Sequence, residues 1–501
     1  MRFQLLTMLF CVFIQTISYA EITIGLSSTP TRLNPLFSTD ANSQNIGRLT
    51  HMSLIDFSDE MQFVCRACER FEQRFEGKKH IIEFWLKKDI TFWDGGSLTA
   101  KDVEKSINYY QSENKKLKSV FRFAFNKIVD VRIKGKYQIE LIYSEFSLEN
   151  LGNLPLLKII KIKDLDKLEK LQLKDIIGAG RYQFGDVKSM SVTLTSTDPD
   201  LEQLVFKTVK DETTLALKLI NNEIDLALSD MSPRKLDWLK NQQRRKIKVW
   251  ERQSTNYKYM GINHNNVYLS KSDVRKALSY LIPRKLILKH KLKFGASLSS
   301  GMLSKPFGGV AHITEADPYD QKMAEKLLDN LGLTINNGIR FKLNLKISNN
   351  KSTVELANVL KQYFEKAGIK INLIVSEWGT FYKAIKRGNF DLMLGQWIGF
   401  TGPDILNYVF HSKKIPPKGA NRGRFQSSEV DKYLDMAMNE KNMQKRNELF
   451  IAAQKEIRQS YPYIDLWHPK VIWIGQECIE IGKLYPNASF YPLLKAKSKC
   501  R

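Results

Sequence analysis

Short apolar segments of strand character alternate along the chain with amphipathic segments of helical period. Residues 21–26 and 80–86 have the period-two or β-branched pattern that predicts strands. Thr99 is followed by Asp102 at capping-box spacing, which predicts a helix that begins there and runs through Tyr110. Two further pairs place a predicted helix before a predicted strand: 212–221 with 224–228, and 352–367 with 370–375. This alternation, without a low-complexity linker, predicts an α/β fold with mixed sheets.

One apolar run, residues 392–394, ends at a cluster of turn-forming residues. The stretch WIGFTGPDIL, residues 397–406, follows it and combines aromatic residues with two glycines and a Pro403-Asp404 turn. An apolar run that stops in this way is typical of a strand that delivers a loop to a surface or a cleft. We therefore treat this loop as a candidate ligand-facing segment.

Residues 1–20 have the pattern of a cleavable secretory signal. A basic start and an apolar run are followed by Ser18 and Ala20, which have the small side chains required before the cleavage site. The alternative, a lipoprotein signal that uses Cys11, is disfavoured because the bulky Phe10 precedes that cysteine. No later segment approaches the ~20 apolar residues that span a bilayer. The mature chain is expected to be exported and soluble, beginning near Glu21.

Export changes the interpretation of the four cysteines that remain. Cys65, Cys68, Cys478 and Cys500 are an even number in an oxidising compartment, which favours disulfides over free thiols. We predict the pairs Cys65–Cys68 and Cys478–Cys500. The Cys65-x-x-Cys68 spacing also fits a redox motif or half of a zinc site, although no second such pair accompanies it.

Composition and charge narrow the class of protein further. The chain has 501 residues, of which 43% are hydrophobic and 11% aromatic, so it is a folded protein of about two to four packed units. The formal net charge is +25, but the lysines are spread along the chain. A solvated basic surface is therefore favoured over a nucleic-acid groove, and we expect no nucleic-acid partner.

No motif in the sequence supports catalysis. The chain has no HExxH, no G-x-S-x-G and no P-loop, and Gly178-Ala179-Gly180 lacks the third glycine of a dinucleotide site. Its seven histidines include no pair at i, i+4 spacing. The residues by themselves therefore leave an enzyme unsupported, and we expect no cofactor and no metal site.

Six motifs stand in a fixed order along the chain: LNP at 33–35, ITFWDGGSLTAKDV at 90–103, GAGRY at 178–182, DVRKALSY at 273–280, NRGRF at 421–425 and EVD at 429–431. In this order they resemble the ABC-transporter extracellular solute-binding proteins of the peptide, opine and nickel class, family five. The arginine at position 181 stands where that family usually has proline.

The resemblance implies a bilobal fold of the type II periplasmic-binding class with an additional domain and a ligand cleft between the lobes. The implied parts are lobe I at 21–55, 177–260 and 468–501, an added domain at 56–176, and lobe II at 261–467. The implied function is capture of oligopeptides or peptide-like solutes in the periplasm by hinge closure, and delivery to a membrane permease, by a monomer. The alternatives are a metal chelate, opine, haem or sugar as solute, or an exported hydrolase or cell-wall-binding protein.

The resemblance also implies which residues face the solute. Trp397 provides a flat apolar wall or, alternatively, fills the core beneath the loop. Peptide-binding members carry an aspartate shortly after this tryptophan that pairs with the peptide's α-amino group. Here Phe400 stands in that region, so we predict that the usual anchor is missing. The ligand then either lacks a free α-amine or reaches another carboxylate, such as Asp40 or Asp404. The full candidate set is Trp397, Gly399, Phe400, Thr401, Gly402, Asp404, Asn421 and Arg424 in lobe II, Thr39, Asp40, Ala41 and Asn42 in lobe I, and Phe121, Arg122 and Phe123 in the added domain.

Overall fold

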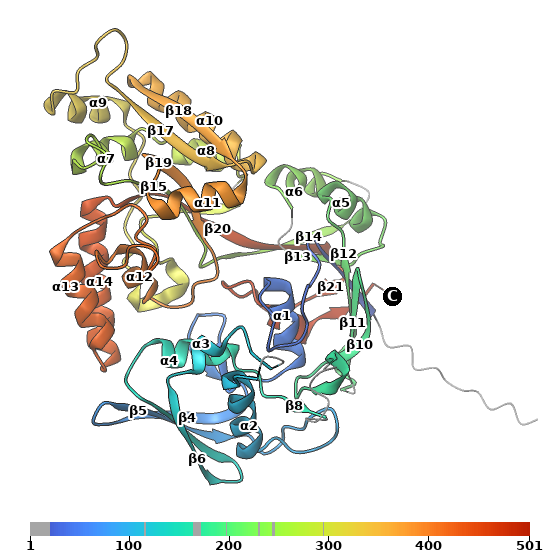
Figure 1. Cartoon of the computed structure of the whole chain (residues 1–501). Helices are drawn as coiled ribbons and strands as arrows, with labels where there is room; N and C mark the ends of the chain where they lie inside the picture. The colour runs from blue at the N-terminus through green and yellow to red at the C-terminus, as the bar shows by residue number, and fades with distance from the viewer. Residues whose placement is uncertain are drawn as a thin grey trace, which may run out of the picture.

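The computed structural model describes residues 21–114, 117–163, 172–196, 198–228, 231–242, 246–293 and 295–500. The predicted signal segment, residues 1–20, lies outside the described residues. Figure 1 shows a mixed α/β molecule in which helices flank a long central sheet and a smaller sheet packs below it. Within the described ranges, no helix is both long enough and apolar enough to cross a membrane.

The central sheet contains twelve strands in the described part of the chain. They are β1 (Glu21–Leu26), β10 (Gln183–Lys188), β11 (Ser191–Thr195), β12 (Gln203–Thr208), β13 (Leu226–Leu228), β14 (Ile247–Gln253), β15 (Tyr257–Ile262), β16 (Ala296–Leu298), β17 (Phe341–Ser348), β18 (Ile369–Ser376), β19 (Leu392–Trp397) and β20 (Tyr463–Gln476). Their order is β10-β11-β12-β1-β13-β20-β15-β19-β17-β18, with β14 and β16 also paired to β20. β1 is parallel to β12 and β13, and β17 is parallel to β18 and β19, so the sheet has two parallel centres.

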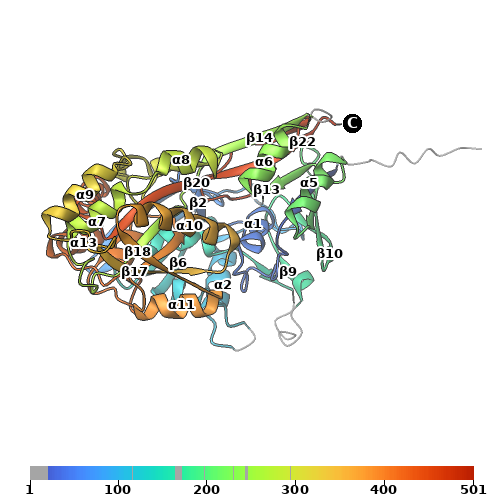
Figure 2. The same cartoon turned by 90° about the horizontal axis from the view of Figure 1, so that it is seen from above.

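The long strand β20 joins these two centres, as the view from above shows (Figure 2). Its first part pairs with β15 from Tyr463 to Trp467, and its second part pairs with β14 from Lys470 to Gln476. Since β14 and β15 follow one another in the chain, a second passage between the two parts of the sheet runs through residues 254–256. The chain therefore crosses twice, side by side.

We call the part with β1 and β10–β14 lobe I and the part with β15–β19 lobe II. The flanking helices of lobe I are α1 (Ala41–Thr50), α5 (Glu212–Ile220) and α6 (Pro233–Lys240). Those of lobe II are α7 (Ser272–Tyr280), α8 (Arg284–His290), α9 (Gln321–Asn330), α10 (Lys351–Lys366), α11 (Trp378–Arg387), α12 (Ile405–Phe410), α13 (Ser428–Asn439) and α14 (Met443–Ser460). Each lobe has its own buried apolar core.

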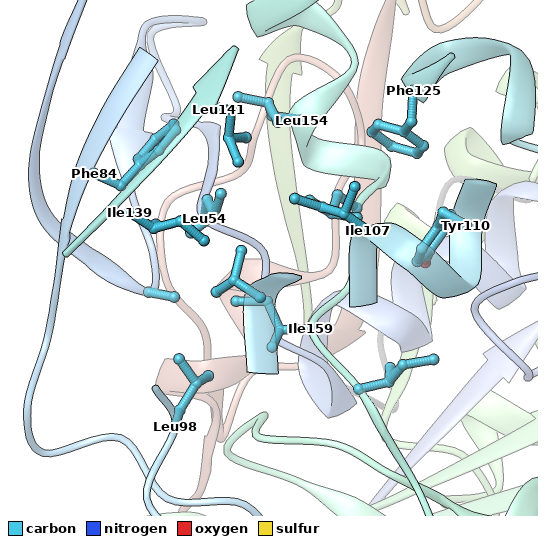
Figure 3. Close-up of a cluster of buried hydrophobic side chains, with 14 of the residues drawn as sticks. Leu54, Phe84, Leu98, Ile107, Tyr110, Phe125, Ile139, Leu141, Leu154 and Ile159 are labelled. Atoms are coloured by element: carbon cyan, nitrogen blue, oxygen red, sulfur yellow. The ribbon is translucent and has the colours of Figure 1, made fainter. Parts of the chain in front are cut away.

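The added domain is a four-stranded antiparallel sheet covered by a helix. In sheet order its strands are β4 (Cys68–Glu76), β5 (Lys79–Leu86), β7 (Gln138–Tyr143) and β6 (Ile128–Gly135), and its helices are α2 (Ala100–Gln111), α3 (Arg122–Phe125) and α4 (Glu149–Gly152). Ile107 and Tyr110 of α2 belong to the same buried core as Phe84 and Leu141 of the sheet (Figure 3). Leu54, which precedes the added domain in the chain, completes that core and so fastens the domain to lobe I.

The predicted elements are confirmed, with shifts of one or two residues at their ends. β1 covers 21–26 as predicted, and α2 begins after Thr99, whose N–H and hydroxyl donate to Asp102 Oδ2 at 2.9 and 2.6 Å. The strand expected to begin at 224 instead begins at Leu226. There the Asp225 carboxylate accepts the backbone N–H of Thr23 at 2.8 Å, which breaks the regular ladder pattern.

Both predicted disulfides are present in the structure. Cys65 pairs with Cys68, at the turn between β3 (Phe63–Cys65) and β4. Cys478 pairs with Cys500 and ties the C-terminal segment to the end of β20. The two cysteines of the CxxC motif therefore form a local disulfide with each other. Among the described residues, no group of three or more His, Cys, Asp or Glu side chains is placed to hold a metal ion.

Candidate functional site

Trp397 ends β19 and stands between the core of lobe II and the surface. Its ring is half-buried against the apolar cluster around Tyr257 and Phe410. Tyr408, which is 46% exposed, meets it edge-on with ring centroids 6.4 Å apart. The guanidinium carbon of Arg422 lies 4.9 Å from the centroid of the Trp397 ring. One part of Trp397 therefore fills the core while another part supports a charged side chain.

The loop after Trp397 uses Phe400 for packing. The Phe400 ring stacks on Phe307, with centroids 5.4 Å apart and planes within 8°. Gly399 has a positive φ of 73°, and its N–H donates to Asn256 Oδ1 at 3.2 Å, which ties the loop to the passage between the lobes. A stacked phenyl ring cannot accept the hydrogen bonds of an ammonium group. Position 400 therefore offers no carboxylate to a ligand.

Asp404 is the acid of this loop, and it has no cationic partner within ion-pair distance among the described residues. Its carboxylate folds back over the loop, because a Cβ at Gly402 would lie 2.3 Å from Asp404 Oδ1. It does not cap α12. Burial, and to a smaller extent the negative charge of Glu149 in the added domain, raises the pKa of Asp404 to about 6. Such a carboxyl group would gain from a cationic partner. Thr401, the residue before Gly402, is half-buried.

An aromatic patch lies beside Trp397 on the surface of lobe II. We define it as Trp378, Tyr382, Trp397 and Tyr408. Trp378 and Tyr382, on successive turns of α11, are 59% and 38% exposed, and their rings stack with centroids 5.8 Å apart. Arg422 lies between them and Trp397, with its guanidinium carbon 5.4 Å from the Tyr382 centroid. Clustered exposed apolar surface is typical of ligand-binding grooves and interaction sites.

The predicted residues Asn421 and Arg424 hold the loop on either side of Arg422. Asn421 is buried, and its amide donates to the carbonyls of His411 and Phe425 at 3.3 and 2.7 Å. Arg424 has a positive φ of 59°, and its guanidinium donates to backbone carbonyls, one of them that of Asn421 at 3.3 Å. Arg422 lies within the predicted segment 421–424 but was not singled out there, and it is the residue that reaches the aromatic patch.

The four predicted residues of lobe I lie at the start of α1, where the fold uses two of their side chains. Asp40 caps the helix: its Oδ1 accepts the N–H of Ser43 at 2.8 Å, and its Oδ2 accepts the hydroxyl of Thr31 at 2.6 Å. These bonds hold the pKa of Asp40 below its usual value, despite partial burial. Asn42 donates to Ser28 O at 2.9 Å, and Thr39 and Ala41 are exposed. Both Asp40 oxygens are occupied, which weakens its candidacy as an amine anchor.

The three predicted residues of the added domain face different ways. Phe121 is buried in the domain core. Arg122 donates from Nε to the carbonyl of Gln111 at 3.0 Å and pairs with Glu113. Phe123 is 70% exposed. Of the three, Phe123 has the most exposed side chain, and the partly exposed Arg122 is engaged with Glu113.

A buried charge cluster lies where lobe I meets the added domain. We define it as Arg48, Asp56, Arg66 and Lys158. Asp56 is fully buried and accepts hydrogen bonds from Arg48 Nε at 3.1 Å and from the Tyr491 hydroxyl at 2.9 Å, while Lys158 Nζ lies 3.9 Å away. Burial lowers the pKa of Lys158 to about 7, although Asp56 opposes this shift. A cavity of about 20 Å³, lined in part by Arg48 and Lys158, adjoins the cluster and has room for one water molecule.

This chain resembles known proteins in both its sequence and its fold. The family model of bacterial extracellular solute-binding proteins, family 5, matches residues 76–415. The oligopeptide-binding protein AppA of Bacillus subtilis is 24% identical over 511 aligned residues, which cover 95% of this chain and 91% of that protein. The AppA structure in complex with a nonapeptide matches with a TM-score of 0.72 and 21% identity, covering 96% of this chain and 99% of that one.

Two further solved structures, both of other binding proteins, also match this chain. HbpA2 from Haemophilus parasuis matches with a TM-score of 0.82 at 20% identity and covers 96% of this chain and all of its own. NikZ from Campylobacter jejuni, in complex with Ni(L-His), matches with a TM-score of 0.74 at 21% identity and covers 96% of this chain and 99% of its own. These matches over nearly the whole chain confirm the predicted mixed α/β fold of periplasmic binding proteins.

Proposed function

This chain belongs to the bacterial extracellular solute-binding proteins of family 5, and on that premise we propose that its solutes are oligopeptides or peptide-like molecules. The family comprises substrate-binding proteins of ABC transport, in a group that includes peptide, nickel and haem binders, and not enzymes. The sequence resemblance to that family is thereby confirmed. The work of such a protein is capture and delivery, without chemistry on the solute.

The observation that carries the peptide proposal is an open strand edge beside the aromatic patch. β19 pairs with β15 along its whole length, up to Trp397, but pairs with β17 only at Leu392 and Met393. The other edge of residues 394–397 therefore has no strand partner among the described residues. An extended peptide can add to such an edge through main-chain hydrogen bonds, while neighbouring pockets and aromatic faces receive its side chains.

Closure of two lobes around the solute completes the proposal. Two side-by-side passages, at 254–256 and within β20, are positioned to act as a hinge. In the proposed division, lobe I comprises 21–55, 177–260 and 468–501, the added domain 56–176 and lobe II 261–467. The proposed cellular setting is the periplasm, after removal of residues 1–20, with a monomer that docks on a membrane permease.

Ligand-dependent stabilisation of the mature protein tests this function. A pool of free nonapeptides should raise the melting temperature and change tryptophan fluorescence. At one hundred times the dissociation constant the expected gain is ~2.7 kcal/mol of unfolding free energy. Nickel–histidine, haem and simple sugars serve as the competing solutes. If one of these stabilises the protein and the peptide pool does not, the peptide proposal fails.

Matched tryptophan variants locate the site. Trp378→Ala, in the aromatic patch, should weaken peptide binding by about fivefold or more, the effect of losing about 1 kcal/mol of contact energy. Trp238→Ala is the control, because Trp238 is similarly solvent-facing, 38% exposed, but lies on α6 of lobe I. Equal effects of the two variants would place the solute elsewhere.

A further inference from the structure

Arg422 is a half-buried cation surrounded by aromatic rings. Its guanidinium carbon lies 4.9 Å from the Trp397 centroid and 5.4 Å from the Tyr382 centroid. Its Nη1 donates to the Tyr259 hydroxyl at 3.4 Å, and the hydroxyls of Tyr382 and Tyr463 are its other polar neighbours. Tyr259 and Tyr463 stack with centroids 4.1 Å apart, so they form a rigid floor beneath the cation.

Arg422 lacks the partners that other buried arginines of this chain have. Arg48 pairs with Asp56, and Arg458 pairs with Asp317. Arg275 donates to backbone carbonyls, including those of Leu269 and Ser460. By contrast, Arg422 forms no ion pair with any residue in the described ranges, although a guanidinium carries five N–H donors.

The aromatic rings around Arg422 stabilise its buried charge and orient its guanidinium for a ligand. Cation–π contacts with Trp397 and Tyr382 offset part of the cost of desolvation. They also hold the guanidinium plane in place, so that its remaining donors are oriented before a ligand arrives. A planar guanidinium matches a carboxylate through two parallel hydrogen bonds, and these are stronger where water is excluded.

We infer that Arg422, whose guanidinium lies near the rings of Tyr382 and Trp397, is the anchor for a carboxylate group of the solute. This inference rests on the proposed function, because it places the group in the same solute site. It gives the site a polarity opposite to that of an amine anchor, in keeping with the phenyl ring at position 400. The ligand class is therefore a peptide or peptide-like molecule with a free carboxylate that reaches lobe II.

Two peptide pools that differ only at the C-terminus test the inference. Calorimetry compares one nonapeptide pool as free acids with the same pool as C-terminal amides, both with free amines. Wild type should bind the free acids at least tenfold more tightly. Arg422→Gln should lose that preference, and Arg422→Lys should recover only part of it, because an ammonium lacks the two-pronged geometry. Arg387→Gln, an equal change of charge at an exposed position of lobe II, should retain it.

The outcomes separate the inference from the function on which it rests. Peptide binding without an acid preference in wild type, or a preference that survives in Arg422→Gln, overturns the anchor and leaves the peptide function intact. If neither pool binds, the peptide function fails and nickel–histidine and haem, which both carry carboxylates, become the probes. A tenfold loss of their affinity in Arg422→Gln then supports the anchor, and an unchanged affinity overturns it. A wild type that binds none of these probes overturns both.

Discussion

Replacing Asp56 by asparagine should destabilise the protein strongly, because this carboxylate neutralises the buried charge cluster. Its oxygens accept hydrogen bonds from Arg48 and Tyr491 at 3.1 and 2.9 Å, and Lys158 Nζ lies 3.9 Å away. Arg66 adds a further positive charge at the same junction of lobe I and the added domain. The asparagine variant keeps the shape of the side chain but leaves three cations without their carboxylate.

The expected cost is about 3–5 kcal/mol of unfolding free energy, the range for removing one partner of a buried ion pair. Lys158 limits this cost at high pH. Burial already lowers its pKa to about 7, and loss of Asp56 removes the interaction that opposes this shift. A lysine whose folded pKa is depressed destabilises the fold while it is protonated, and that penalty disappears as the pH rises. The deficit should therefore be larger at pH 6 than at pH 9.

Urea unfolding at pH 6 and pH 9, followed by circular dichroism, measures both effects. Asp59→Asn is the control, because Asp59 is partly exposed and pairs with Arg252 and Lys483 at 3.2 and 2.6 Å. Exposed pairs contribute about 0–1 kcal/mol, so that variant should remain near wild type. The reasoning would be refuted by a cost for Asp56→Asn below about 1 kcal/mol, or by a deficit that grows toward pH 9.

Three other predictions follow from local geometry. Lowering the pH from 7 to 4.5 should lower the melting temperature, because histidines become protonated below about pH 6.5 in the unfolded chain while the buried ones stay neutral in the folded protein. A melting temperature that does not change over this range would contradict the prediction. Burial lowers these pKa values to about 3 for His51 and His264, and to about 4 for His80 and His468. Gly180→Ala should cost about 1–3 kcal/mol in chemical unfolding, because its Cβ would lie 2.3 Å from the carbonyl carbon of Thr50; Gly47→Ala, whose Cβ meets no atom within 4 Å, is the control. N-acetylation of a bound peptide should weaken calorimetric binding less than about tenfold, because Phe400 replaces the amine anchor, and a larger loss that vanishes in Asp404→Asn would instead assign the anchor to Asp404.

Local patterns in the sequence were sufficient to predict the secondary structure and the disulfides. The capping-box spacing of Thr99 and Asp102 placed the start of α2, because the hydrogen bonds that begin a helix form within a few residues. The pairs Cys65–Cys68 and Cys478–Cys500 are close in sequence, which limits the alternatives. The order of six motifs was enough to identify the family and hence the fold, since each marks a turn or helix start that the shared architecture requires.

The position of the site was predictable to the level of a loop, but not to the level of a side chain. The segment NRGRF offers an asparagine and two arginines, and the sequence does not tell which of them reaches the surface patch. The backbone decides this: Arg424 takes a left-handed conformation that directs its donors to carbonyls, and Asn421 is buried beneath the turn. An irregular loop has no period from which such directions follow.

Only the tertiary structure determined the surroundings of the charged groups. The neighbours of Arg422 are Tyr382 of α11, Trp397 of β19, Tyr259 of β15 and Tyr463 of β20, and they are up to about 160 positions away from it in the chain. Asp56 likewise meets Lys158 and Tyr491 only after the chain has folded. Whether a charge is paired, unpaired or buried depends on the desolvation and the partners that distant segments bring to it, and these quantities do not exist until the elements pack.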